Sequence, residues 1–205
     1  MLKIALCGAG GSGKGTLARE ISRKFGFQLL PSPNQDVGLL LQPEKSNYKD
    51  IQIQSTEEER NLYQHCILFP QIINELNASR HTALGYVSER SVFDYLAYDY
   101  KYARENGNTE AFDNYEQLVL RAYHQNPYDV IFFLSSNDFE PQDKEAGKWK
   151  ERDPEDRKWT NNWLYYYLVN SGNVDKSHVC ALCGTVDERL EHASQVIRSF
   201  QEQSA

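Results

Sequence analysis

The sequence has few cysteines and no long apolar run, and these two absences exclude several classes of protein. Four cysteines among 205 residues are too few for a disulfide-rich scaffold, so we expect free thiols in a reducing compartment. No apolar stretch approaches the ~20 residues that a membrane-spanning helix needs. The segment 1–8 before the glycine cluster is too short for a secretory signal. We therefore expect a cytoplasmic protein with no membrane partner.

An excess of positive charge is also lacking. The chain has 22 basic and 29 acidic residues, a net charge of -7, which argues mildly against a general nucleic-acid binder because such proteins usually carry a basic face. The Asn-Lys-x-Asp motif expected of a GTPase switch is absent. Hydrophobic residues make up 40% of the chain and aromatic residues 12%, which is enough for a core. The length suits a single domain over residues 1–205.

Apolar runs and helical repeats alternate along the chain. The apolar runs predict strands at 2–7, 27–30, 83–88, 128–135 and 178–183. Helical spacing predicts helices over 14–25, 55–76, 93–100, 112–122, 154–171 and 185–200. A capping box of Ser55 and Glu58 should start the second helix, and Pro70 should kink or break it. Strands separated by helices imply parallel pairing, so the predicted fold class is a three-layer α/β domain.

A glycine-rich segment follows the first strand and opens the first helix. This strand–loop–helix context is the one that a phosphate-binding P-loop requires. Backbone N–H groups of such a loop point at phosphate oxygens, the helix N-terminus adds its positive end, and Lys14 supplies a charge for the β and γ phosphates. We therefore predict that ATP is bound by Gly8, Gly10, Gly11, Ser12, Gly13, Lys14, Gly15 and Thr16, with Mg²⁺ as metal.

The residue after the P-loop lysine departs from a common pattern. Many P-loop proteins place there a serine or threonine that contacts Mg²⁺, whereas this chain has Gly15 followed by Thr16. Thr16 or Ser12 could provide the hydroxyl ligand, or water could replace both, and the sequence leaves this open. The segment Gly13–Thr16 (GKGT) resembles nucleoside and nucleotide kinases, adenylate kinase among them, more than it resembles switch GTPases.

An acid follows the third predicted strand. Parallel strands end at the same rim of a sheet as the phosphate loop, so Glu89 should lie near the phosphates. There it could hold Mg²⁺ through water or accept a proton from the phosphoryl acceptor. The neighbouring Arg90 could bind the transferring phosphate. The alternative is an acid that complements a helix dipole, with Arg90 on the surface.

A basic segment near residue 150 predicts a lid. Residues 148–158 contain five basic side chains, and Asp153-Pro154 is typical of a helix start. The segment resembles the arginine-bearing lid of the nucleoside and nucleotide kinases, and the resemblance implies a lid over 136–158 in which Arg152 and Arg157 neutralise the transferring phosphoryl group. The alternative is a solvated charged loop.

Two of these motifs carry a family resemblance. The Glu-Arg-Ser at 89–91 resembles the Asp/Glu-Arg-Ser motif of deoxynucleoside kinases. The longer stretch ERSVFDYLAYDY resembles a P-loop ATPase/kinase-like family that includes nicotinamide riboside kinase-like domains. The resemblance implies a glutamate facing the metal, an arginine facing phosphate and an arginine-bearing lid. It also implies an acceptor-site region over 34–80 and, as weaker assignments, adenine contact by Gly184 and substrate contact by Asp36, Gln64, Gln71 and Asp94.

Three functions remain in view. The first is ATP-dependent phosphoryl transfer to a nucleoside or nucleotide. The second is a kinase acting on a hydroxymethylated base or a nucleotide end in DNA, which the charge of -7 disfavours. The third is a regulatory module that binds ATP and hydrolyses it slowly or not at all, and such a module would be expected to lack the acid or a lid arginine. The sequence leaves open the acceptor, the choice of ATP or GTP, and whether the chain forms a homodimer.

Overall fold

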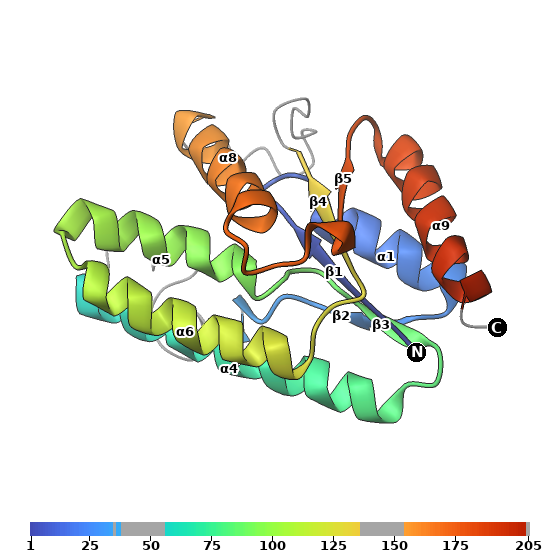
Figure 1. Ribbon diagram of the computed structural model, residues 1–205, viewed down its shortest axis with the longest axis horizontal. Coiled ribbons are helices and arrows are strands. Elements are labelled where there is room, and N and C mark those ends of the chain that lie inside the picture. Colours follow the sequence, from blue (N-terminus) through green and yellow to red (C-terminus); the bar gives the residue numbers. More distant parts are fainter. Residues whose placement is uncertain (35, 38–55, 136–153, 204–205) are drawn as a thin grey trace.

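Five parallel strands form the centre of the computed structural model, which describes residues 1–34, 36–37, 56–135 and 154–203 (Figure 1). The strands are β1 (Leu2–Cys7), β2 (Gln28–Leu30), β3 (Gly85–Ser88), β4 (Val130–Leu134) and β5 (Val179–Leu182). Their order across the sheet is β2-β3-β1-β4-β5, and every neighbouring pair is parallel. Each lies within a range that the apolar runs predict, and the predicted α/β class is confirmed.

Helices connect the strands and cover both faces of the sheet. They are α1 (Lys14–Phe25), α4 (Glu57–His81), α5 (Phe93–Asn106), α6 (Thr109–Gln125), α8 (Pro154–Asn170) and α9 (Val186–Gln203). A short 3-10 helix, Lys176–His178, precedes β5. All six predicted helices are present in the described ranges, and α4, α5 and α6 are longer than their apolar repeats indicate. None of the described helices is long and apolar enough to cross a membrane.

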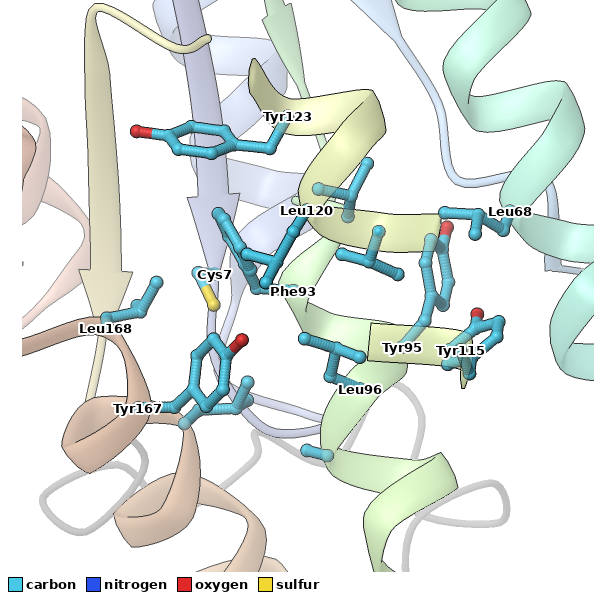
Figure 2. Packing of buried hydrophobic residues seen from close by; sticks show 14 of the residues in the cluster. Cys7, Leu68, Phe93, Tyr95, Leu96, Tyr115, Leu120, Tyr123, Tyr167 and Leu168 are labelled. Carbon is cyan, nitrogen blue, oxygen red and sulfur yellow. The ribbon is translucent and has the colours of Figure 1, made fainter. Parts of the chain in front are cut away.

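The central strand divides its side chains between two apolar layers, because alternate residues of a strand point to opposite faces. Ile4 and Leu6 pack in the layer formed with α1 and α9. Ala5 and Cys7 pack in the layer formed with α4, α5, α6 and α8. Figure 2 shows Cys7 in this second layer, near the ring of Phe93. The two layers hold the sheet in place. Because β1 pairs in parallel with β3 and with β4, the carboxyl ends of these three strands share one rim.

The start of α4 differs from its prediction by one residue. Thr56, rather than Ser55, is the N-cap, and its hydroxyl accepts from the N–H of Glu59 at 3.3 Å. The N–H of Thr56 donates to the Glu59 carboxylate at 2.7 Å, which completes the capping box. The predicted break at Pro70 is wrong, since α4 runs through it as one helix. A proline removes a single backbone donor, and buried residues on both sides of it, such as Leu68 and Ala78, hold the helix in place.

The apolar residues of α4 lie on its solvent side as well as in the core. Tyr63, Ile67 and Leu68 are buried in the core. In contrast, Leu62, Phe69 and Ile73 are 56%, 51% and 55% exposed. The helix is therefore apolar on its solvent side as well as on its core side. Periodicity predicts which residues share a face, but the packing of the whole chain decides which face is covered.

Candidate functional site

The glycine-rich loop connects β1 to α1 and folds around the Lys14 ammonium. Gly13 is the N-cap of α1 with φ 87°, a left-handed conformation that favours glycine. Lys14 is 6% exposed, and its Nζ donates to the carbonyl oxygens of Gly8 and of Ala9, the latter at 3.0 Å. The hydroxyl of Ser12 is buried and has no hydrogen-bond partner within the described residues. The loop therefore holds a cation and an unpaired polar atom where a phosphate would bind.

Asp94 supports this loop from the protein interior. Its Oδ1 lies 3.6 Å from Lys14 Nζ and accepts from the N–H of Gly8 at 3.2 Å. Its Oδ2 accepts from the N–H and the hydroxyl of Ser91, at 3.0 and 2.8 Å. Burial lowers the pKa of Lys14, and the Asp94 carboxylate raises it in compensation. The structure thus places Asp94 behind the P-loop, where it joins the loop to the turn after β3.

Glu89 lies at the end of β3 beside the first turn of α1. Its N–H donates to Leu30 at 2.9 Å, and its Oε2 accepts from the N–H of Ser32 at 3.4 Å. A Cβ placed on Gly15 would come within 2.8 Å of Glu89 Oε1. The Glu89 carboxylate therefore lies beside the residue that follows Lys14, at the P-loop, as the order of the strands predicts.

These residues fit a Mg²⁺ ion that is bound mainly through a nucleotide. Mg²⁺ commonly keeps several waters and takes one or two carboxylates together with phosphate oxygens. Glu89, at the loop and partly exposed, offers such a carboxylate. Thr16 is exposed in the first turn of α1. Within the described ranges no three His, Cys, Asp or Glu side chains gather into a metal site, so the ion would need the phosphates.

Arg90 follows Glu89 and lies against the same aspartate. Its Nη1 is 3.9 Å from Asp94 Oδ1. Its backbone carbonyl accepts from Gln71 Nε2 at 3.0 Å. The same Gln71 nitrogen is 2.6 Å from both Ser88 Oγ and Glu75 Oε1. Gln71 therefore braces the turn that carries Glu89 and Arg90 from its protein side.

The support behind Gln71 includes a buried carboxyl group. Tyr128 donates its hydroxyl to both oxygens of Glu75, at 2.9 and 3.1 Å. Burial raises the pKa of Glu75 to about 7. Tyr95 donates to Gln71 Oε1 at 3.3 Å, so both ends of the Gln71 amide contact the protein. The prediction that Gln71 contacts a base stays a prediction, and these contacts favour a supporting role.

The other acceptor-site candidates lie on α4 and after β2. Gln64 is buried, and its Oε1 has no hydrogen-bond partner among the described residues. The same holds for Asn34 Oδ1, whose backbone carbonyl accepts from the Tyr63 hydroxyl at 3.0 Å. Asp36 is exposed. Sequence reasoning did not single out Asn34, although it lies in the same segment after strand two as Asp36.

The predicted lid lies mostly outside the described residues, and so does Arg152. Pro154 begins α8 as predicted, and Arg157 is in the first turn of this helix. The rings of Trp159 and Trp163 stack on Tyr100 of α5, with centroids 6.2 and 5.1 Å apart. An ion pair between Asp156 and Lys101 adds to this contact. Arg157 is therefore carried on a helix end that is anchored to α5.

The turn between β5 and α9 brings a residue that sequence reasoning did not single out. Gly184 is in this turn. Thr185 and Glu188 form a capping box, in which the Thr185 N–H donates to the Glu188 carboxylate at 2.8 Å and the Glu188 N–H donates to the Thr185 hydroxyl at 3.3 Å. Arg189 follows, 1% exposed, and donates to the carbonyl of Ser12 in the P-loop at 2.7 Å. The sequence signal that points to Arg189 is its place next to Leu190, one of the apolar positions of this helix.

Comparisons with known proteins bear on the family and the fold of this chain. A family model described as AAA domain matches residues 3–189. No curated protein matches the chain. Deoxyadenosine kinase from M. mycoides with bound dATP is similar in structure, with a TM-score of 0.67 and 18% identity over 97% of this chain and 100% of that one. The same enzyme with bound dCTP gives 0.65 and 18% over the same shares.

The NadR protein in complex with NAD and AMP-PNP is a further match. It has a TM-score of 0.64 and 15% identity, over 97% of this chain and 49% of that one. At such identities the likeness shows the fold alone, and the predicted P-loop kinase fold is confirmed. Because the family model covers most of the sequence, the chain belongs to the AAA domain family.

Proposed function

We propose that this protein is an ATP-dependent kinase that transfers the γ-phosphoryl group to a nucleoside or nucleotide. The observation that carries the proposal is the close approach of the Glu89 carboxylate to the Lys14 end of the P-loop. A P-loop alone indicates phosphate binding. An acid at the same rim adds the group that phosphoryl transfer needs near the acceptor or the metal. The likeness in fold to deoxyadenosine kinase and to NadR supports the same reaction class.

Positioning and electrostatics would account for most of the catalysis. Lys14 and the loop N–H groups bind the phosphates, and a bound Mg²⁺ would neutralise part of their charge. Glu89 holds the acceptor hydroxyl or a metal-bound water in place. Arg90, Arg152 and Arg157 stabilise the charge that spreads over the transferring group. Gly184, in the turn that opens α9, is proposed to contact the adenine through its backbone.

The acceptor site is proposed to lie between the segment after β2 and helix α4. Asn34 and Gln64 present amide oxygens that are buried and unpaired within the described residues. Such atoms are costly unless a ligand supplies donors, which the hydroxyl groups of a sugar or the amino group of a base would do. The charge of -7 supports a nucleoside or nucleotide over a DNA substrate, whose phosphates would be repelled.

ADP release in the presence of different acceptors tests the proposal. The panel contains nucleosides, nucleoside monophosphates, nicotinamide riboside and a hydroxymethylpyrimidine DNA duplex. We expect turnover with a small acceptor, and we expect Glu89→Gln to lower it by roughly 10²- to 10⁴-fold, the usual contribution of a positioned acid or base. Glu110→Gln, an exposed change on α6, is the matched control. If the protein binds ATP but no acceptor in the panel stimulates turnover, the result would contradict the proposed kinase activity and favour the regulatory module.

We also propose that the chain forms a homodimer through α4. Leu62, Phe69 and Ile73 share one exposed face of this helix, and an apolar helix face is normally covered. Phe69 is midway between Leu62 and Leu76, so two antiparallel copies related by a two-fold axis near Phe69 place apolar residues opposite one another.

The charges of the helix agree with this antiparallel arrangement. The helix begins with three glutamates at 57–59 and ends with Arg80 and His81. Antiparallel pairing brings the acidic end of one copy beside the basic end of the other. The antiparallel arrangement is therefore favoured by charge as well as by the apolar stripe.

Replacing Phe69 with glutamate is expected to convert the dimer to a monomer. Light scattering after size-exclusion chromatography should show the mass fall from twice 23.7 kDa to 23.7 kDa. Asn74→Glu, exposed on the same helix but outside the stripe, should remain dimeric. A wild-type chain that stays monomeric at every concentration tested would show that another segment or partner covers this face.

A further inference from the structure

Arg189 is a buried cation that reaches from α9 into the wall of the phosphate loop. Its Nη1 donates to the carbonyl oxygen of Ser12 at 2.7 Å, and its Nη2 donates to the carbonyl oxygen of Ser135 at 3.0 Å. The residue is 1% exposed. A charged group this deeply buried is costly unless its donors are used, so these bonds to main-chain oxygens matter for the structure of the loop.

The bond to Ser12 sets the direction of the next N–H group. The carbonyl of Ser12 and the N–H of Gly13 belong to one planar trans peptide, so they point to opposite sides. Arg189 holds the carbonyl outward, toward α9. The N–H of Gly13 then points to the inner side of the loop, where phosphate oxygens bind. Gly13 has a φ of 87° in this orientation of the peptide, a left-handed conformation that favours glycine.

The bond to Ser135 fixes the same guanidinium to the rim of the sheet. Ser135 directly follows β4, which pairs with β1, and β1 leads into the loop. The loop, the end of β4 and the start of α9 are therefore joined through one side chain. A planar guanidinium can make both bonds at once, whereas a lysine ammonium at the end of a flexible stem lacks this fork geometry.

We propose that Arg189 is a positioning residue that presets the Ser12–Gly13 peptide for phosphate binding. The inference rests on the proposed binding of a nucleoside triphosphate at the P-loop. A preset loop binds its ligand without a cost of reorganisation, so the loss of Arg189 weakens binding of the polyphosphate whatever base it carries. This distinguishes a role on the loop from a contact with the adenine.

The test measures binding of ATP and of inorganic tripolyphosphate by titration calorimetry. Arg189→Gln should weaken both ligands by a similar factor of roughly 10- to 100-fold, as expected for the loss of charge-assisted hydrogen bonds. Arg189→Lys should fall between this variant and the wild type. Arg198→Gln, exposed further along α9, should bind both as the wild type does.

Added guanidinium ion gives a further test, because it would not restore ATP binding if Arg189 only stabilised the fold. At concentrations too low to denature the protein, it should restore part of the ATP affinity of Arg189→Ala and leave the wild type unchanged. Urea unfolding of each variant shows whether it is folded. If Arg189→Gln and Arg189→Ala do not fold, the comparison is made with Arg189→Lys. A folded Arg189→Gln that binds tripolyphosphate as the wild type does would overturn the proposal, and so would a loss confined to ATP. Binding is measured without an acceptor, so a failure of the kinase reaction would be recorded separately.

Discussion

Replacing Lys14 with alanine is expected to lower the acceptor-dependent turnover of ATP by about a thousand-fold, the upper range for removal of one preorganised donor. The Lys14 ammonium is bound to the carbonyls of Gly8 and Ala9 and lies near the Asp94 carboxylate, so its charge is already placed at the loop. Phosphate oxygens are stronger partners for an ammonium than neutral carbonyls are. The transferring group would lose this charge in the variant.

Steady-state rates of ADP release, with the acceptor identified by the panel, check this expectation. Lys24→Ala is the matched control, because Lys24 is on the same helix but only pairs weakly with Glu191 at 3.8 Å. Its rate should equal that of the wild type. A Lys14→Ala protein that keeps most of its acceptor-dependent turnover would remove the P-loop from the proposed mechanism.

The parts of the fold that could be predicted depend on local patterns. An apolar run such as 130–134 specifies a buried strand, and a repeat such as that of α9 specifies a helix, without knowledge of distant residues. Strands linked by helices pair in parallel, and parallel strands end at one rim. The same reasoning predicts the position of Glu89 beside the P-loop. The position of the capping box on α4 was missed by one residue because Ser55 and Thr56 both suit an N-cap.

The remaining features depend on contacts between distant parts of the chain. Arg189 bonds to carbonyls 177 and 54 positions away, and no local pattern indicates which backbone a buried arginine meets. Likewise, no local pattern indicates that the Gln71 amide bonds to Ser88, 17 positions away. The exposure of Phe69 is likewise a property of packing.

Replacing Asp94 with asparagine is expected to destabilise the protein by about 3–5 kcal/mol, the range for breaking a buried ion pair by removing one partner. The carboxylate is fully buried and accepts from the N–H groups of Gly8 and Ser91. An amide of the same shape would turn an NH₂ group toward one of these donors. It would also leave Lys14 buried without its counter-charge. Urea unfolding measures the loss, and Asp113→Asn, exposed on α6, should change stability by less than about 0.5 kcal/mol.

The dependence on pH identifies the source of this loss. Burial lowers the pKa of Lys14 and Asp94 raises it, so the variant should lower that pKa further. A lysine whose pKa is lower in the folded state binds fewer protons there than in the unfolded state, so stability rises with pH up to the unfolded value. The difference in free energy of unfolding between wild type and Asp94→Asn should therefore be large near neutral pH. It should become smaller as the pH approaches about 10.4, the ordinary lysine pKa.

A double-mutant cycle with Lys14→Met separates the ion pair from the other contacts of Asp94. If the buried charge of Lys14 causes most of the loss, Asp94→Asn should cost markedly less in the Lys14→Met protein than in the wild type. Equal costs in both backgrounds would show that the hydrogen bonds to Gly8 and Ser91 dominate instead. In that case Asp94 would hold the P-loop by shape and hydrogen bonding rather than by charge. The expected coupling instead makes the carboxylate the counter-ion that keeps a buried ammonium charged beside the phosphate site.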